Sequence, residues 1–437
     1  MCKYKGKWAL SVIAVILQIT AISPSSLFSQ QRDTLISRIE AIPGVSGVKR
    51  LESPNFNDKY VLYFQQPLDH KNPSAGSFTQ RVFLMNLSFS RPTVIVTEGY
   101  GAAYAANPRY RDELSRLFET NIVFVEHRYF LESTPNPLEW KYLTAENSAN
   151  DLHNIKKAFE QYYRGKWIAT GVSKGGQTAL IYRAFFPDDV DITVPYVAPL
   201  CKGREDGRHE PFLSEFVGSP QQRELLEDFQ FEILNRREEL QPKFDSLCSV
   251  KGYKFNLTTR EIYDYSVLEF PFAFWQWGSP ISEVPAKGSS ANEVFKYWMK
   301  ISPVDYFVNE SSTTAFFVQA ARELGYYGYD TKPFKGLLAI KNSKGYLNRL
   351  FVPANAEFKF DRSLYKKLKR FVANTPERMM FIYGEYDPWS AVMVNEPKSE
   401  NVVLFIEPKG SHRARISTLP PQMREQAVER LKIWLSE

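Results

Sequence analysis

The sequence predicts an α/β fold with a mostly parallel sheet flanked by helices and a large, mainly helical insertion. Over residues 93–197, short apolar and β-branched runs alternate with amphipathic helical segments, as they do in parallel sheets. Charge-rich helical stretches with few β-branched runs then fill residues 201–374, a length far too great for a loop. Strand-like runs return at 378–384 and 401–406, so the sheet resumes after the insertion.

We expect the core to comprise residues 30–200 and 375–437, with the insertion between them. Its elements are an N-terminal extension at 30–60, a β-hairpin from 61–64 and 78–89, strands at 93–97, from 121, at 167–169 and at 190–197, and helices at 147–163, 178–185 and 425–435. Pro187 ends the second of these helices, because proline cannot continue a helix.

The turn between the strand at 167–169 and the next helix reads Gly171-Val172-Ser173-Lys174-Gly175. A G-x-S-x-G between strand and helix is the nucleophile elbow of α/β-hydrolases. Its glycines remove the β-carbons that would collide where the strand turns sharply into the helix. The pattern therefore predicts an α/β-hydrolase in which Ser173 is the nucleophile and the N–H of Lys174 faces a developing oxyanion. The alternative is a glycine-rich turn with an incidental serine.

The loop after the strand at 93–97 is expected to complete the oxyanion hole. It reads Glu98-Gly99-Tyr100-Gly101-Ala102-Ala103. In α/β-hydrolases the loop after this strand supplies a second N–H, so Tyr100 or Gly101 is the candidate donor. A plain tight turn is the alternative.

Two later segments supply partners for a nucleophilic serine. Asp387 follows the strand at 378–384, where ligand sites lie in open α/β sheets, and we expect it to hold the catalytic imidazole. Glu385 is its nearest rival. His412 is the expected general base, because it follows the last strand and no other histidine comes after Asp387. His127 precedes the serine and does not fit the chain order Ser, Asp, His.

Residues 1–29 have the form of a secretory signal peptide. Three lysines precede a largely apolar run, and a stretch of serine and proline follows. The run is too short for a good membrane span. We therefore expect cleavage near Ser29, a secreted or periplasmic protein, and no stable membrane insertion; an uncleaved signal anchor is the alternative. Cleavage lowers the formal charge from +6 to +3 by removing the three lysines, and with no basic run interleaved with aromatic residues we expect no nucleic-acid partner.

The mature chain keeps two cysteines, Cys201 and Cys248. They could pair in an oxidising compartment, and we predict this disulfide, with two free buried thiols as the alternative. The five histidines never stand at metal-site spacing from another histidine or a cysteine. We therefore expect no metal and no other cofactor.

Four motifs together resemble the secreted prolyl aminopeptidases, in particular the actinobacterial prolyl tri/tetrapeptidyl aminopeptidase family. They are the elbow at 171–177, the segment 125–130 with Glu132-Ser133, the phrase at 142–147 and the run Gly384-Glu385-Tyr386-Asp387-Pro388-Trp389. Lysosomal Pro-X carboxypeptidases are related and share the Glu-His-Arg strand. The resemblance implies an α/β-hydrolase core with a helical cap, and a serine exopeptidase that releases tri- or tetrapeptides after proline. It carries Ser173, Asp387 and His412 over as the triad.

Cleavage after proline requires an apolar, aromatic slot for the pyrrolidine ring. The aromatic stretch 269–277 in the insertion is the best candidate, with Phe272, Phe274 and Trp275 as its expected lining. The alternative is that these rings form the core of the cap.

An exopeptidase that acts from the amino end also requires a carboxylate for the substrate ammonium, because a buried cation needs a partner. The candidates are Glu98, Glu126, Glu205 and Asp206. Glu98 is attractive because its loop is expected to line the site. For Glu126 a structural ion pair with Arg128 is the favoured alternative.

An esterase or lipase on the same scaffold is the alternative function. It would share the triad, so only the cap distinguishes it from an aminopeptidase. A lipase would have a broad apolar groove in the cap and no carboxylate for an ammonium. A non-catalytic binding protein is the third class, but no member of the triad is missing. The expected partners are therefore peptide substrates with a free amino end.

Overall fold

The computed structural model describes residues 35–309, 311–356, 358–395 and 397–437, so the expected signal peptide lies outside the described residues. Its centre is a sheet of nine strands in the order β1-β2-β3-β5-β4-β6-β7-β8-β9. The strands are β1 (Val45–Leu51), β2 (Asp58–Pro67), β3 (Ser77–Asn86), β4 (Thr93–Thr97), β5 (Asn121–Val125), β6 (Trp167–Val172), β7 (Ile192–Tyr196), β8 (Arg378–Gly384) and β9 (Val402–Glu407). Neighbours from β5 to β9 are parallel, which confirms the mostly parallel sheet.

The N-terminal edge of the sheet is antiparallel. β2 and β3 form the predicted hairpin, and β3 also pairs with β5. The expected extension contributes β1, which pairs with β2 through a register shift between Ser46 and Lys49. None of its residues is fully buried, so its sequence lacks the apolar alternation that marks a strand.

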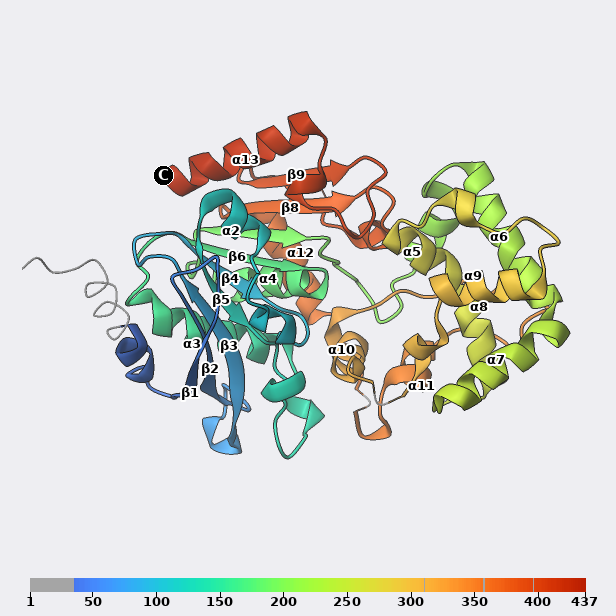
Figure 1. Cartoon of the computed structure of the whole chain (residues 1–437), viewed down its shortest axis with the longest axis horizontal. Coiled ribbons are helices and arrows are strands. Elements are labelled where there is room, and N and C mark those ends of the chain that lie inside the picture. Colours follow the sequence, from blue (N-terminus) through green and yellow to red (C-terminus); the bar gives the residue numbers. More distant parts are fainter. Residues whose placement is uncertain (1–34, 310, 357, 396) are drawn as a thin grey trace, which may run out of the picture.

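Helices cover both faces of the sheet, as the two sets of strand side chains require. The core helices are α2 (Glu113–Phe118), α3 (Ala145–Glu160), α4 (Lys174–Phe185), α12 (Ser363–Asn374) and α13 (Pro421–Ser436). Ile95 packs with Leu152 of α3 on one face, whereas its neighbour Val94 packs with Leu114 of α2 and Leu431 of α13 on the other. The result is a layer of helices on each side of the strands (Figure 1).

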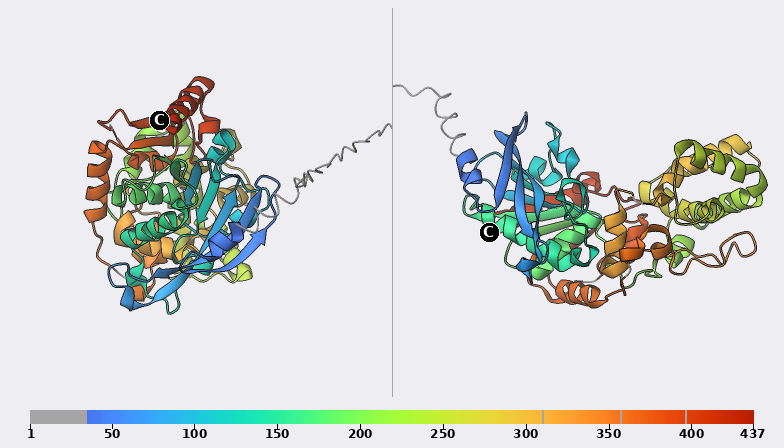
Figure 2. Two further views of the ribbon diagram at one scale, coloured as in Figure 1. Left: turned by 90° about the vertical axis from the view of Figure 1, so that its left-hand side faces the viewer. Right: turned by 90° about the horizontal axis from the view of Figure 1, so that it is seen from below.

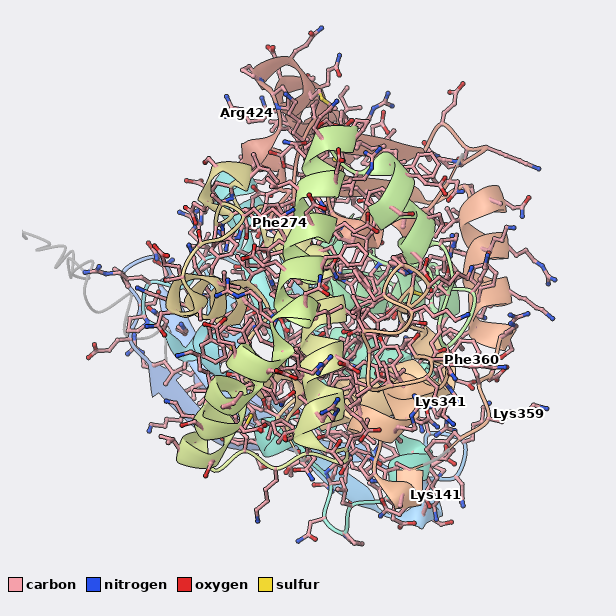
Figure 3. All side chains as sticks on the ribbon, turned by 90° about the vertical axis from the view of Figure 1, so that its right-hand side faces the viewer. Lys141, Phe274, Lys341, Lys359, Phe360 and Arg424 are labelled. Atoms are coloured by element: carbon pink, nitrogen blue, oxygen red, sulfur yellow. The ribbon has the colours of Figure 1, made fainter. Side chains whose placement is uncertain are left out.

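The insertion forms a mainly helical cap. Its helices are α5 (His209–Pro211), α6 (Pro220–Asn235), α7 (Arg237–Lys251), α8 (Thr259–Trp277), α9 (Ala291–Ile301), α10 (Thr314–Gln319) and α11 (Tyr346–Phe351). The helices α5 to α9 stand beyond the ends to which the arrows of β8 and β9 point (Figures 1 and 2). Seen from that side, the yellow-green α6 and α7 lie in front of the core (Figure 3). The cap has its own aromatic core, in which Phe270 of α8 packs on Phe229 of α6.

The helix α12 belongs by its packing to the core, although it falls within the expected insertion. Its Leu364, Leu368 and Val372 are buried with Leu180 and Ile181 of α4. The chain therefore returns to the sheet before Ser363. Nowhere in the described residues is a helix both long and apolar enough to cross a bilayer.

Candidate active site

The turn at Ser173 is held in a strained conformation by close packing on both sides. Ser173 has φ 58° and ψ −120°, and its N–H donates to the carbonyl oxygen of Tyr196 at 2.8 Å. A β-carbon at Gly171 would lie 2.4 Å from the carbonyl of Gly175, and one at Gly176 would lie 2.6 Å from the Tyr196 oxygen. Only glycine fits at these positions, so the sequence fixes a sharp turn that projects Ser173 from the sheet.

Sheet order places the loop after β4 against this turn, because β4 and β6 are parallel neighbours. A β-carbon at Gly99 would lie 2.6 Å from the backbone nitrogen of Gly175. The N–H of Tyr100 donates to the Glu98 carboxylate at 3.2 Å. The N–H of Lys174 is at the start of α4, where helix geometry leaves it without an intrahelical partner.

The side chain of Lys174 is buried directly beside the elbow. Its Nζ has no hydrogen-bond partner in the part of the chain that the structure describes, and it lies 5.7 Å from the ring centre of Tyr100 and 5.4 Å from that of Phe130. Burial lowers the pKa of Lys174 to about 7, while the Glu98 carboxylate favours the charged form. Two aromatic faces therefore surround this amine.

Asp387 and His412 are in direct contact. Asp387 is fully buried at the end of β8, and its carboxylate lies 2.7 Å from Nδ1 of His412 while also accepting the N–H of Trp389 at 3.1 Å. Glu385 instead accepts the N–H of Lys409 at 2.6 Å. Nε2 of His412 is buried without a hydrogen-bond partner among the described residues. The imidazole is thus oriented by one carboxylate and has one nitrogen available for chemistry.

Ser173 opens into a cavity of about 440 Å³ between core and cap. The core contributes Ser173 and Tyr100, and the cap contributes Glu269, Trp277 and Tyr327 among others. Both polar and aromatic side chains therefore surround Ser173, as in most sites for small ligands.

Glu269 of α8 places a buried carboxylate on the wall of this cavity. It is 5% exposed and accepts hydrogen bonds from the hydroxyl of Tyr327, at 3.0 and 2.9 Å, and from that of Tyr329 at 2.7 Å. Burial raises the pKa of Glu269 to about 7, although both hydroxyls lower it. Asp305 also lines the cavity but is exposed.

Comparison with known proteins decides the family. The profile of the PS-10 peptidase S37 family matches residues 31–436. This chain belongs to the peptidase S37 family. The S37 peptidase is 32% identical over 421 residues to the prolyl tri/tetrapeptidyl aminopeptidase of Streptomyces mobaraensis, which covers 94% of this chain and 86% of that protein. The resemblance stated from the motifs is thereby confirmed, and the chain is a serine peptidase with an α/β-hydrolase fold.

Two more distant relatives extend the comparison. The lysosomal Pro-X carboxypeptidase of Mus musculus is 26% identical over 157 residues, or 32% of each chain. The crystal structure of a proline iminopeptidase from Mycobacterium smegmatis superposes with a TM-score of 0.39 and 11% identity, over 89% of this chain and 99% of that one. Similarity at this level does not bear on the function of the S37 peptidase.

The three aromatic residues predicted to form the proline slot do not line the cavity at Ser173. Phe272 and Trp275 line a separate cavity of about 310 Å³, and Phe274 lies in the core of the cap. The side of α8 that faces Ser173 instead carries Glu269, Ala273, Gln276 and Trp277. Their spacing of four, seven and eight residues is that of one helix face, and this periodicity is the sequence signal that could have identified them.

Glu126, a predicted ligand of the substrate amine, is engaged within the core. Its carboxylate pairs with Arg81 and accepts the N–H of Ala102 at 2.8 Å and the hydroxyl of Ser133 at 2.9 Å. It is fully buried and does not line the cavity. The alternative, an ion pair between Glu126 and Arg128, is also wrong, because Arg128 binds Asp151 at 2.7 Å. The charged residues at the end of this strand therefore pair with residues that are distant in sequence, and the sequence alone does not reveal these partners.

The other candidate carboxylates do not line the cavity either. Glu98 accepts the hydroxyl of Tyr104 at 2.6 Å, and burial raises its pKa. Asp206 is paired with Arg208 at 2.5 Å. Glu205 lies on a different surface depression of the cap. Glu269 is therefore the buried carboxylate at the site, and sequence reasoning passed over it as one end of an aromatic stretch.

The predicted disulfide is not formed. Cys201 and Cys248 are both free and buried. Cys201 lies in the connection after β7, against the backbone of Gly325, whereas Cys248 is in α7, which packs against α8 and α9. The alternative of two buried thiols describes the structure.

Proposed function

We propose that this S37 peptidase is an exported exopeptidase that removes tri- or tetrapeptides from the free amino end of its substrates by cleavage after proline. One observation carries the proposal: Ser173 and the buried carboxylate of Glu269 line the same cavity, whose wall also includes Trp277 and Trp389, the two indoles that contact His412. The name of the Streptomyces relative describes the same activity. An esterase has no use for a buried anion at this place, because its substrates carry no ammonium.

Acylation follows from the geometry around the imidazole. Ser173 Oγ attacks the carbonyl carbon of the substrate prolyl residue, and Nε2 of His412 takes the hydroxyl proton. Asp387 accepts a hydrogen bond from Nδ1–H of His412 and stabilises the imidazolium cation that forms. The oxyanion accepts hydrogen bonds from the N–H of Lys174 and from Tyr100 or Gly101. For Tyr100 to donate, its N–H must leave the Glu98 carboxylate.

Breakdown of the intermediate uses the same proton. His412 gives it to the leaving amide nitrogen as the carbon–nitrogen bond breaks, which leaves the prolyl carbonyl esterified to Ser173. Water then takes the place of the departed amine. His412 removes a proton from this water, the ester is hydrolysed, and the free peptide carboxylate leaves.

Glu269 suits the recognition of the substrate ammonium. A carboxylate has about four lone-pair sites, and the two hydroxyls of Tyr327 and Tyr329 have one proton each, that of Tyr327 lying within reach of both carboxylate oxygens. A remaining site accepts from the ammonium, whose charge also suits the aromatic faces around it. Because Ser173 and Glu269 line the same cavity, this contact would limit the number of residues that are released.

The proline ring requires an apolar surface close to Ser173. Among the residues that line the cavity, Tyr100, Phe316 and Trp389 provide aromatic surface. Phe316 packs edge-on against Tyr100, with ring centres 5.5 Å apart. We assign the proline slot to this group in place of the residues predicted from sequence.

The test compares Ala-Ala-Pro-p-nitroanilide with a free and with an acetylated amino end, alongside a short-chain ester. Of the two peptides we expect cleavage only of the one with a free amino end, and complete loss of that cleavage in Ser173→Ala. Glu269→Gln should lower kcat/KM for the free peptide at least tenfold, or about 1.4 kcal/mol, with little effect on the ester. Asp305→Asn, on the exposed side of the same cavity, is the control and should stay within twofold. Ester hydrolysis without peptide cleavage would favour the esterase.

Export is tested separately. The proposal places the signal at residues 1–29, so the protein recovered outside the cytoplasm should begin near residue 30. N-terminal sequencing of that protein decides the point, and a chain that still begins at Met1 would argue for an uncleaved anchor.

A further inference from the structure

Trp277 occupies an unusual position at the mouth of the cavity. It is the last residue of α8, lines the same cavity as Ser173, and is 50% exposed. Its indole stands edge-on to the imidazole of His412, with ring centres 6.0 Å apart and planes at 87°. A large aromatic side chain that is half exposed beside a catalytic group has apolar surface available for a ligand.

The backbone fixes Trp277 relative to the imidazole. The N–H of His412 donates to the carbonyl oxygen of Gln276 at 3.0 Å. Gly278, with φ 68°, ends the helix directly after Trp277 and would place a β-carbon 3.1 Å from that of Ser411. The end of this cap helix is therefore tied to the loop that carries the general base, and the indole keeps its place beside it.

The chemistry then decides which part of the substrate meets the indole. His412 must protonate the leaving nitrogen, so the first residue after the scissile bond lies next to the imidazole. An enzyme that removes a short peptide from the amino end must leave the rest of the substrate, of any length, in solvent. Two indoles flank the imidazole, and of these Trp389, at 6.5 Å, is buried. Of these two indoles, Trp277 is the one that is exposed to solvent.

We propose that Trp277 is the binding platform for the residue that follows the scissile prolyl bond, and that it favours a large apolar or aromatic side chain there. The inference rests on the proposed function, since it takes the acyl part of the substrate to lie toward Glu269. The exposed guanidinium of Arg413 lies 5.9 Å from the indole ring centre and helps to hold the ring in place.

The first test varies only the leaving residue. Wild-type enzyme should cleave Ala-Ala-Pro-Phe-NH₂ with a kcat/KM about tenfold above that for Ala-Ala-Pro-Gly-NH₂, as expected for one stacked ring. In Trp277→Ala this ratio should fall to within twofold of one, whereas Trp277→Phe should keep most of the preference. Phe216→Ala removes another aromatic residue, 68% exposed and away from the cavity, and should leave the ratio unchanged.

A second test does not depend on the peptide specificity. Any ester that acylates Ser173 produces an acyl-enzyme whose transfer to added phenylalaninamide or glycinamide competes with hydrolysis. We expect a strong preference for phenylalaninamide that Trp277→Ala removes. An unchanged preference in that variant overturns the role of Trp277, whatever the peptide specificity proves to be. Failure of the Ala-Ala-Pro peptides with normal acyl transfer would overturn only the proposed function, and the absence of any acyl transfer would overturn both.

Discussion

At the residue scale, Glu385 and Asp387 are close to each other in sequence, but only Asp387 contacts His412. Because Asp387 is the carboxylate that contacts Nδ1 of His412, Asp387→Asn should lower kcat by about 10⁴-fold by favouring the wrong imidazole tautomer. Glu385→Gln is the matched control: its carboxylate contacts the N–H of Lys409 instead, and kcat should stay within twofold. Steady-state kinetics on both variants decides the assignment. Equal losses in the two would contradict it.

The buried carboxylate of Glu269 lowers the stability of the protein at neutral pH. Its pKa of about 7 in the folded state lies above the ordinary value of 4.5, so the folded protein binds more protons than the unfolded chain between these values. Stability should therefore fall as pH rises through this range, by about 3 kcal/mol at most. Glu269→Gln removes the ionisation and keeps a partner for the tyrosine hydroxyls.

Thermal unfolding at two pH values measures this effect. We expect Glu269→Gln to raise Tm by a few degrees at pH 8 and to leave it nearly unchanged at pH 4.5, where the wild-type group is protonated in both states. A variant that loses stability equally at both pH values would show that Glu269 has only a structural role.

The same ionisation affects catalysis with the opposite sign, because the charged form binds the substrate ammonium. For substrates with a free amino end, KM should rise as pH falls below about 7. In Glu269→Gln this dependence should disappear from KM, while His412 continues to control kcat. The charged form of Glu269 thus favours substrate binding while the neutral form favours folding, an opposition that is common for buried charges in active sites.

Sequence reasoning proposed those candidate site residues that chain order and local turns mark, and their catalytic roles stay predictions. Ser173 lies in a G-x-S-x-G pattern that predicts one sharp turn between strand and helix. Asp387 and His412 follow the ends of strands in the chain order Ser, Asp, His that is typical of α/β-hydrolases. Glu269 and Trp277 were missed because their role depends on which face of α8 meets the core. A stretch dense in aromatic residues has apolar side chains all round the helix, so the sequence does not distinguish the faces.

At the element scale, the strand–turn–helix at Ser173 requires glycine at its closest contacts, because the turn has no room for a β-carbon there. Gly171→Ala would bring a β-carbon to 2.4 Å from the backbone of Gly175, which can move only if α4 shifts away from β6. We expect a loss of more than about 2 kcal/mol in unfolding free energy, as for other overpacked sites. Activity should fall further than stability, because the shift also displaces Ser173.

The matched control for this prediction is Gly203→Ala. A β-carbon there would lie no closer than 3.6 Å to any neighbour, which is ordinary contact. Denaturant unfolding and kcat/KM should both stay close to wild type. If Gly171→Ala also remained stable and active, the close packing of the elbow would have no energetic role.

Elements with a clear apolar period were predicted well, and those without one were not. The strands from β4 to β8 are largely buried runs that stand out from their surroundings. β1 is an edge strand without a buried residue, and α12 shows an amphipathic face but nothing in its sequence to say whether that face meets the cap or the core. Contacts between distant segments decide such cases.

At the scale of the whole molecule, core and cap each bury their own apolar side chains, and the cavity lies where they meet. The core could be predicted because its alternation of strand and helix permits few arrangements. The cap could not, since several amphipathic helices can pack in many ways. The identity of the peptidase therefore follows from the core, while its specificity depends on the cap.

The two buried thiols give a prediction for the whole fold, because a disulfide would have tied the start of the cap to α7. Burial raises the pKa of Cys248 to about 11 and that of Cys201 further, so almost no thiolate exists at pH 8.

The native mature protein should resist alkylation, and the denatured protein should react at both cysteines without prior reduction. Its Tm should be the same with and without reductant, whereas loss of a disulfide would cost about 2–5 kcal/mol. A Tm that falls on reduction would show that the two cysteines form a disulfide, and Cys201 would then have to lie closer to α7 than it does in this structure.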